Sequence, residues 1–313
     1  MLKQLFNEAV IRLTIQPDGP ILIKAGETGA DPTRPDMEFV RTWRNGERVV
    51  YLPGSSLKGV LRAHCERIVR TVDSGNDEQR PRACDPLGKR SCSERLGRIK
   101  GLASERAYSD SCFICQLFGN QVLAGRLRTS DAYPTGPIHT EQRDGVAIDR
   151  VFGAVAHGPF QYETVSSGVF QTTLTLRNFT LAQLGLLGLA LRDLRRGQIG
   201  VGFGKSRGLG HVTADFEQLI IRYPACDVRD NTLYLLGRAT AVAPANTLPG
   251  AGVFVPAGSA YGVSANDALT LPDGMRIEPN EWQEATLALQ GAAVEQLWRE
   301  AVPYWRTAMG IAR

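Results

Sequence analysis

The sequence contains no hydrophobic run long enough to cross a membrane. Its most apolar stretch, Leu181–Leu191, is interrupted by Gln183, Gly185 and Gly188, whereas a membrane-spanning helix needs about 18 consecutive apolar residues or more. The first fifteen residues mix charged and apolar side chains, which is unlike the apolar centre of a secretory signal. These absences predict a cytoplasmic protein that makes no contact with a membrane.

Lysine and histidine are scarce, and the familiar catalytic motifs are missing. Only six of the 36 cationic residues are lysine, and no HExxH, paired-glutamate or Ser-His-Asp arrangement occurs. The abundant arginine gives residues 1–225 a charge of +7, against −3 for residues 226–313. Arginine binds phosphate in a bidentate manner and stacks on bases. This distribution indicates a polyanionic partner for residues 1–225, with a coding bias toward arginine as the alternative explanation.

Hydrophobic periodicity predicts a mixed α+β fold. The 313 residues, 43% of them apolar, suffice for one elaborated domain or two ordinary ones. Asn45-Gly46 predicts a hairpin turn between strands 38–43 and 48–52. The same patterns predict further strands at 10–15, 21–24, 169–176 and 211–222, and helices at 53–71, 181–195 and 281–307. This order is typical of a split β-α-β, or ferredoxin-like (RRM-like), core with large insertions.

Four of the six cysteines cluster in or beside a polar insertion at about residues 73–120. Disulfides are rare in cytosolic proteins, where clustered thiols indicate a metal instead. Cys112 and Cys115 have the two-residue gap that lets two thiolates bind one tetrahedral Zn²⁺, and Cys84 and Cys92 would complete a four-cysteine site. The latter pair lacks a standard zinc-finger spacing, so His64 is the substitute ligand. A redox pair is the competing interpretation. The other two cysteines are expected in the core.

A glycine-dense loop follows the predicted helix at 181–195. Its segment Gly200–Gly210 is not a nucleotide phosphate loop, because Ile199 occupies the position of the required first glycine and the loop enters a strand rather than a helix. Glycine backbone does allow close approach to a ligand, and exposed amides and cations bind phosphate oxygens. The loop therefore predicts RNA contact through Gly202, Gly204, Lys205, Ser206 and Arg207, with a flexible connector as the alternative.

Two further segments carry groups able to act on a polyanion. Pro53–Gly59 (PGSSLKG) places free amides at a helix start beside Lys58, and such amides bind anions. An ordinary N-cap at Ser55 or Ser56 explains this motif equally well. Asp31 and Asp36 lie in a Gly- and Pro-rich stretch, where an exposed carboxylate can accept a proton from a 2′-hydroxyl or hold a Mg²⁺-bound water. Taken alone, these aspartates are explained as turn residues.

Together these segments resemble the RAMP superfamily, specifically the backbone subunit of type III CRISPR effector complexes. The matching pieces occur in the order of that family between about residues 10 and 222: Leu52–Arg62, Cys112–Gly119, Ile148–Gly153, Tyr162-Glu163 and Gly200–Gly210. The resemblance implies a ferredoxin-like core ended by the glycine loop. It also implies a β-hairpin thumb at about 140–168 that wedges between bases of the guide–target duplex. The C-terminal extension, residues 226–313, lies outside the match and is either a subunit contact or a second, degraded module.

The resemblance also implies roles for individual residues. Ser55, Ser56, Lys58 and Arg62 would lie along the guide RNA, and Arg150 and Phe152 would contact bases at the thumb. Asp36 would cleave target RNA with Mg²⁺ or Mn²⁺, with Asp31 in reserve. The implied partners are CRISPR RNA, target RNA, copies of this chain or related RAMP subunits, and other type III subunits. The alternatives are an inactive structural scaffold and a repeat-processing endoribonuclease, for which His64 is the only candidate.

Overall fold

A seven-stranded antiparallel sheet forms the centre of the computed structural model, which describes residues 3–26, 34–73 and 81–311. The strands follow the order β15-β16-β9-β1-β8-β4, and β5 also pairs with β8. Their bounds are β1 Glu8–Pro17, β4 Leu127–Thr129, β5 Tyr133–Pro134, β8 Phe170–Arg177, β9 Val212–Tyr223, β15 Glu278–Pro279 and β16 Ala285–Gln290. The fold is therefore mixed α+β, as the periodicity predicts.

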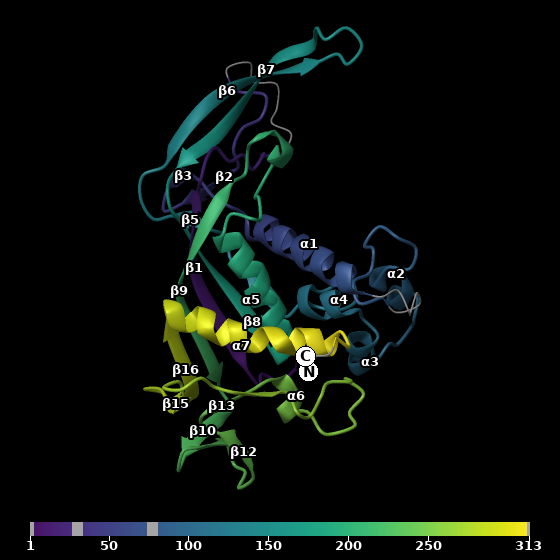
Figure 1. Ribbon diagram of the computed structural model, residues 1–313, viewed down its shortest axis with the longest axis vertical. Coiled ribbons are helices and arrows are strands. Elements are labelled where there is room, and N and C mark those ends of the chain that lie inside the picture. The colour runs from purple at the N-terminus through teal and green to yellow at the C-terminus, as the bar shows by residue number, and fades with distance from the viewer. Residues whose placement is uncertain (1–2, 27–33, 74–80, 312–313) are drawn as a thin grey trace.

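Three long helices cover one face of this sheet (Figure 1): α1 Gly54–Val72, α5 Leu181–Arg195 and α7 Ala292–Ala308. The central strand β1 alternates accordingly. Ala9, Ile11, Leu13 and Ile15 are buried beneath the helices, whereas Arg12 on the other face is exposed. Strands β8 and β9 both run antiparallel to β1 and are joined by α5. They are therefore parallel to one another, with β1 between them.

Two hairpins project from this body. The short one consists of β2 Arg41–Arg44 and β3 Glu47–Val50, and its turn residues Asn45 and Gly46 have φ of 51° and 83°, as expected for an Asn-Gly hairpin turn. The long one, β6 His139–Ile148 and β7 Val155–Ser167, extends away from the sheet at the top of Figure 1. It is called the thumb below, because it occupies the predicted thumb segment.

The remaining elements are short. They are α2 Cys92–Gly97, α3 Ser104–Ser109, α4 Phe113–Phe118 and α6 Ala251–Phe254; the 3-10 turn η1 Lys205–Arg207; and β10 Cys226–Arg229, β11 Thr232–Leu235, β12 Ala241–Pro244, β13 Thr247–Pro249 and β14 Ala268–Thr270. The two cysteines outside the cluster, Cys65 and Cys226, are buried as expected. Among the described residues, no helix combines the length and apolar character that crossing a membrane requires.

The C-terminal extension completes the core. β16 pairs with β9, and α7 packs on α5. A Cβ atom on Gly188 would lie 2.5 Å from Cγ of Trp298, and one on Gly185 would lie 2.2 Å from the carbonyl oxygen of Ala301. The glycines that interrupt the most apolar run of the sequence are thus the positions at which α7 approaches α5.

Three local predictions are wrong. Residues 21–24 form isolated bridges, not a strand, because they contact several different segments in turn. The expected helix at 281–307 begins only at Ala292, since the alternating residues 285–290 extend the sheet beside β9. Neither Ser55 nor Ser56 caps α1: the cap residue is Pro53, and Oδ1 of Asp131 accepts the Gly54 N–H at 2.7 Å. This last contact spans 77 residues and is set by tertiary structure.

Glu8 is a buried carboxylate held between two arginines of neighbouring strands. It lies opposite Arg177 of β8 and Arg222 of β9. One oxygen accepts from Nε and Nη2 of Arg222 at 2.8 and 2.6 Å, and the other accepts from Arg177. Burial by itself would raise the pKa of Glu8, but the hydrogen bonds and charges of the two arginines hold it below its ordinary value.

We expect Glu8→Gln to lower the free energy of unfolding by about 2 kcal/mol at pH 7, because Arg177 and Arg222, which are both partly exposed, lose their hydrogen bonds to a charged partner. Because the pKa of Glu8 is lower in the folded than in the unfolded protein, its carboxylate stabilises the fold at pH values above the unfolded pKa of about 4.3. This stabilisation is lost as the pH falls through the folded pKa. Urea unfolding measured from pH 7 downward should therefore show the gap between Glu8→Gln and wild type closing below about pH 4. A gap independent of pH would contradict this account.

Candidate metal centre and nucleic-acid interface

Cys84, Cys92, Cys112 and Cys115 converge in one buried cluster, with their four sulfur atoms within 4.8 Å of one another. All four are free thiols, and the Sγ atoms of Cys84 and Cys115 are 3.7 Å apart. Tetrahedral zinc with Zn–S bonds of about 2.3 Å separates its sulfurs by about 3.8 Å. The donor set and its spacing therefore fit a four-coordinate metal ion such as Zn²⁺.

Backbone amides of the same segments point at the sulfurs. Cys112 Sγ accepts the N–H of Cys84 at 3.5 Å and that of Cys115 at 3.4 Å, and Cys92 Sγ accepts the N–H of Cys112 at 3.2 Å. Cys112 is also the N-cap of α4, and Cys92 is the first residue of α2. The N-termini of α2 and α4 thus bring Cys92 and Cys112 together, although the gap between Cys84 and Cys92 is longer than the gap between Cys112 and Cys115. N–H donors of this kind stabilise thiolate charge.

The burial of the thiols favours a metal site over a redox pair. Hydrogen bonds from Cys112 and Cys115 lower the pKa of Cys84 to about 6, whereas its three thiol neighbours raise the pKa of Cys112. A reactive redox cysteine is accessible and has a lowered pKa, but Cys112 and Cys115 are both buried. His64, the substitute ligand, lies elsewhere: its Nε2 is 2.8 Å from Asp193 Oδ2.

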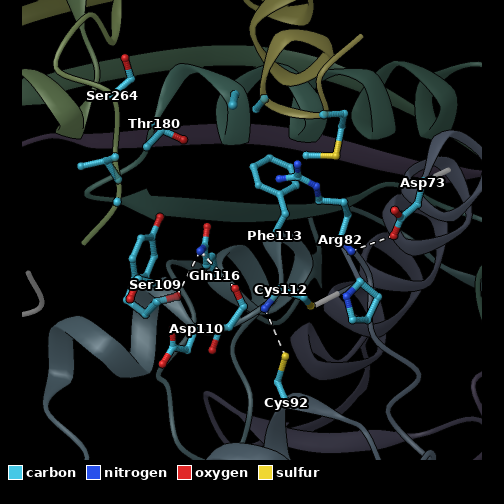
Figure 2. A pocket seen from close by; sticks show the side chains of 18 of the residues that line it. Asp73, Arg82, Cys92, Ser109, Asp110, Cys112, Phe113, Gln116, Thr180 and Ser264 are labelled. Carbon is cyan, nitrogen blue, oxygen red and sulfur yellow. Dashed lines mark hydrogen bonds between the residues drawn. The ribbon is translucent and has the colours of Figure 1, made fainter. Parts of the chain in front are cut away.

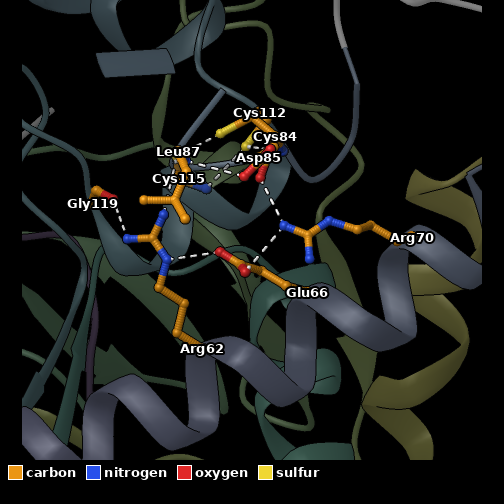
Figure 3. A network of polar contacts seen from close by, with 9 residues as sticks. All are labelled: Arg62, Glu66, Arg70, Cys84, Asp85, Leu87, Cys112, Cys115 and Gly119. Carbon is orange, nitrogen blue, oxygen red and sulfur yellow. Dashed lines mark hydrogen bonds and ion pairs between the residues drawn. The ribbon is translucent and has the colours of Figure 1, made fainter. Parts of the chain in front are cut away.

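A polar network attaches the cysteine cluster to α1 (Figure 3). Arg62 donates to Glu66 at 2.9 Å, to the carbonyl oxygen of Gly119 at 3.0 Å and to Cys115 Sγ at 3.6 Å. Arg70 donates to Glu66 at 3.1 Å and to the carbonyl oxygen of Cys84 at 2.8 Å. All three side-chain nitrogens of Arg62 are therefore engaged within the protein. The predicted contact of Arg62 with RNA remains a prediction, and its observed contacts are structural.

The glycine loop presents an exposed basic turn. η1 lies between Gly204 and Gly208, whose φ values of 70° and 79° are left-handed and favour glycine. Lys205, Ser206 and Arg207 are all exposed. The Arg207 guanidinium lies 4.9 Å from the ring centroid of Phe203. The three polar side chains are thus available to an anion.

The segment 20–25 links this loop to two other predicted sites. The carbonyl oxygens of Pro20 and Leu22 accept N–H groups of the loop at 2.9 and 2.7 Å. Ile21 exchanges two backbone hydrogen bonds with Val165, at 2.8 and 2.9 Å. Residues 161–167 of β7, where the thumb joins the body, are called the thumb base below. Ile23 and Ala25 bond to Val40 and Glu38 of the segment that follows Asp36. The loop, the thumb base and the Asp36 segment are therefore assembled around one short stretch of chain.

Asp36 is exposed at the thumb base. Its Oδ2 accepts the Gln161 N–H of β7 at 2.7 Å, and Met37 bonds to Gln161 and Glu163 of the same strand. Within the described residues, the other oxygen, Oδ1, has no hydrogen-bond partner. Asp31, the reserve residue, lies outside the described residues.

The thumb tip carries exposed apolar side chains. Val151 and Phe152 are 81% and 86% exposed, and Arg150 is exposed beside them. Asp149 Oδ1 accepts the N–H groups of both Val151 and Phe152 at 2.8 Å, which fixes the turn. Arg150 and Phe152 are therefore displayed together at the end of the hairpin.

The start of α1 is less open to an anion than its sequence indicates. Asp131 already occupies the first amide, and this carboxylate would repel a phosphate there. Ser55 is exposed, and Ser56 and Lys58 are half-buried. Burial, followed by the charges of Arg62 and Arg128, lowers the pKa of Lys58. Arg128, on β4, is an exposed cation that sequence reasoning missed; only the pairing of β4 with β8 brings it near α1.

A pocket of about 810 Å³ lies between the cysteine insertion and the C-terminal extension (Figure 2). Arg82, Asp110, Gln116, Thr180 and Ser264 are among the residues lining it. Asp267 at its wall accepts the N–H groups of Leu181 and Gly252 at 2.9 and 3.0 Å, and burial raises its pKa to about 6. The sequence offered no sign of this pocket, because segments far apart in the chain form it.

Comparison with known proteins agrees with this arrangement. The model of the RAMP superfamily matches residues 14–213, which include the end of β1, the whole of α1, β8 and α5, the cysteine cluster, the thumb and the glycine loop. The chain therefore belongs to the RAMP superfamily. Membership indicates a CRISPR-associated role in RNA binding, within the multi-subunit complexes in which RAMP proteins generally work. No curated protein matches the sequence.

Proposed function

We propose that this chain is a CRISPR RNA-binding backbone subunit of a type III effector complex. In this proposal it is cytoplasmic and lies in a filament with copies of itself or related RAMP subunits. It binds the guide–target duplex and cleaves target RNA through Asp36 with Mg²⁺ or Mn²⁺. The observation that carries the proposal is the assembly of the glycine loop, the thumb base and the Asp36 segment around residues 20–25 in a RAMP chain.

We further propose that the core is ferredoxin-like. The strand order β9-β1-β8-β4, with α1 and α5 as the two helices on one face, supports this topology. RNA would then pass across the end of the sheet at which the loop and the thumb base meet. There η1 would hold sugar-phosphate backbone, and Arg150 and Phe152 at the thumb tip would contact bases.

The cysteine cluster would hold a structural Zn²⁺ in this proposal. The insertion around it has short helices and little apolar material, so a metal supplies stability that its small core lacks. Arg62 and Arg70, both on α1, would hold the cluster against this helix, and their hydrogen bonds to Glu66 fix the positions of the two guanidinium groups. In this role the ion has no part in RNA cleavage.

The experiment that tests RNA binding removes the two cations of η1. We expect Lys205→Ala/Arg207→Ala to weaken binding of single-stranded RNA and to reduce the slope of log K against log salt by about 1.4, since each lost phosphate contact contributes about 0.7. The measurement is fluorescence anisotropy with labelled RNA over a range of salt concentrations.

The matched control is Arg238→Ala/Arg276→Ala, which removes the same charge from the C-terminal extension. Both of its arginines are exposed. It should leave the slope unchanged. Equal slopes for wild type and the η1 variant would contradict the assignment of the loop, and wild-type protein without affinity for RNA at low salt would contradict the proposed function itself.

An inactive scaffold is the principal alternative. Incubating the assembled complex with matched target RNA and Mg²⁺ distinguishes the two, because a cleaving backbone produces regularly spaced products and a scaffold produces none. The repeat-processing alternative requires an accessible His64. That side chain is bound to Asp193 and only 15% exposed, so no observation favours it.

A further inference from the structure

The β2–β3 hairpin carries an exposed tryptophan that no site described above uses. Trp43 is 73% exposed, and within the described residues its ring has no aromatic or cation–π partner. Its cross-strand partner is Arg48. Trp282 is as exposed, at 77%, so exposure alone does not mark a ligand site, and the groups around Trp43 carry the argument.

The hairpin is held rigidly against the body at both of its faces. Arg41 binds Glu163 of the thumb base through two hydrogen bonds of 2.7 and 2.5 Å. On the opposite face, the Arg44 guanidinium lies 4.1 Å from the ring centroid of Tyr133, which in turn stacks on Tyr51 at 5.9 Å. These contacts hold the backbone of the hairpin on which Trp43 stands.

The surroundings of Trp43 favour nucleic acid over protein. Alternation along a strand places Trp43 on the same face as Arg41, which is the face turned toward the thumb base and its polar cleft of Glu38, Arg48, Gln142 and Glu163. The hairpin has three arginines and one glutamate. A protein-docking anchor has apolar neighbours around it, whereas those of Trp43 are charged.

We propose that Trp43 is a stacking site for a nucleobase of single-stranded RNA. Arg48, whose Nη2 lies 4.0 Å from Glu38 Oε2 and whose side chain is 47% exposed, would be the nearest cation for the adjoining phosphate. Aromatic rings interleaved with cations bind single strands in this way, and the stacking is tolerant of sequence. The site deepens the proposed function and rests on it. It adds a contact on the body of the subunit, beside the thumb base to which Asp36 is hydrogen-bonded.

The test compares Trp43→Ala with Trp43→Phe and Trp282→Ala in the full chain. The probes are a labelled single-stranded RNA and an abasic RNA of the same length. Stacking contributes about 1–3 kcal/mol per base, so we expect Trp43→Ala to weaken RNA binding roughly tenfold. Trp43→Phe should recover most of the affinity.

Trp282, which is 77% exposed, is the matched control in the C-terminal extension, and its loss should have no effect. Abasic RNA should bind wild type and Trp43→Ala alike.

Three outcomes would overturn the inference. If wild type binds RNA and Trp43→Ala binds it equally well, the ring contacts no base. If Trp43→Ala leaves RNA affinity intact but weakens self-association in sedimentation, the ring is a protein contact. If wild type itself binds no RNA, the proposed function fails and this inference fails with it, and the wild-type measurement alone identifies that case.

Discussion

Replacing Asp36 with asparagine is expected to reduce target RNA cleavage by at least about 10²-fold while RNA affinity stays unchanged. Removing a positioned acid–base group typically costs 10²–10⁴-fold in rate. Asparagine keeps the oxygen that accepts the Gln161 N–H, so the thumb base should be preserved. What is lost is the negative charge of the carboxylate, which would accept a proton from the 2′-hydroxyl or bind a Mg²⁺-bound water.

The measurement is single-turnover cleavage of matched target RNA by the assembled complex with Mg²⁺, alongside anisotropy of RNA binding. Asp31→Asn is measured beside it, because it makes the same change in the same Gly- and Pro-rich stretch and tests the reserve residue. Cleavage that persists at the wild-type rate in Asp36→Asn and is lost in Asp31→Asn would move the catalytic role to Asp31. Cleavage persisting in both would leave the scaffold alternative.

Replacing Cys112 with serine is expected to abolish zinc binding and to unfold the cysteine insertion. Structural zinc sites in small peptides contribute an apparent 10–16 kcal/mol at pH 7, far more than the insertion's short helices α2, α3 and α4 supply. Serine is itself a good N-cap, so the start of α4 should be retained. The variant therefore isolates the loss of the metal from the loss of the cap.

Zinc content by mass spectrometry and thermal unfolding with and without a chelator provide the measurement. We expect one zinc per wild-type chain, none in Cys112→Ser, and a lower Tm in both the variant and the chelated wild type. The matched control is Cys226→Ala, which removes a buried cysteine outside the cluster and should keep its zinc. A wild-type chain that purifies without metal and is insensitive to chelator would contradict the site.

Prediction from sequence succeeded where the determining interactions are local. Asn45-Gly46 sets a hairpin turn through its own φ angles, and the 3.6-residue period of α1 reports the buried face of that helix. The Cys112–Cys115 gap likewise predicts metal ligation without reference to other segments. The helix expected at 281–307 failed at its first half, because residues 285–290 also satisfy the alternation of a strand, and the free edge of β9 decides between the two.

The candidate site depended more heavily on distant contacts. Arg62, whose contact with RNA stays a prediction, bonds to Gly119 and Cys115 as well as to its neighbour on the same helix, Glu66. Asp131, which no sequence pattern indicates, accepts the first amide of α1. The bonds to Gly119, Cys115 and Asp131 have no local signal, since each joins residues more than 50 positions apart.

The amino-acid sequence alone determined the family resemblance, the mixed α+β class, the four thiols and the polar residues of the glycine loop, because composition, spacing and periodicity are properties of neighbouring residues. Tertiary structure decided which of these groups meet. The backbone of residues 20–25 bonds to three segments at once, and those pairings are chosen by burial and hydrogen-bond satisfaction over the whole chain, which no short stretch encodes.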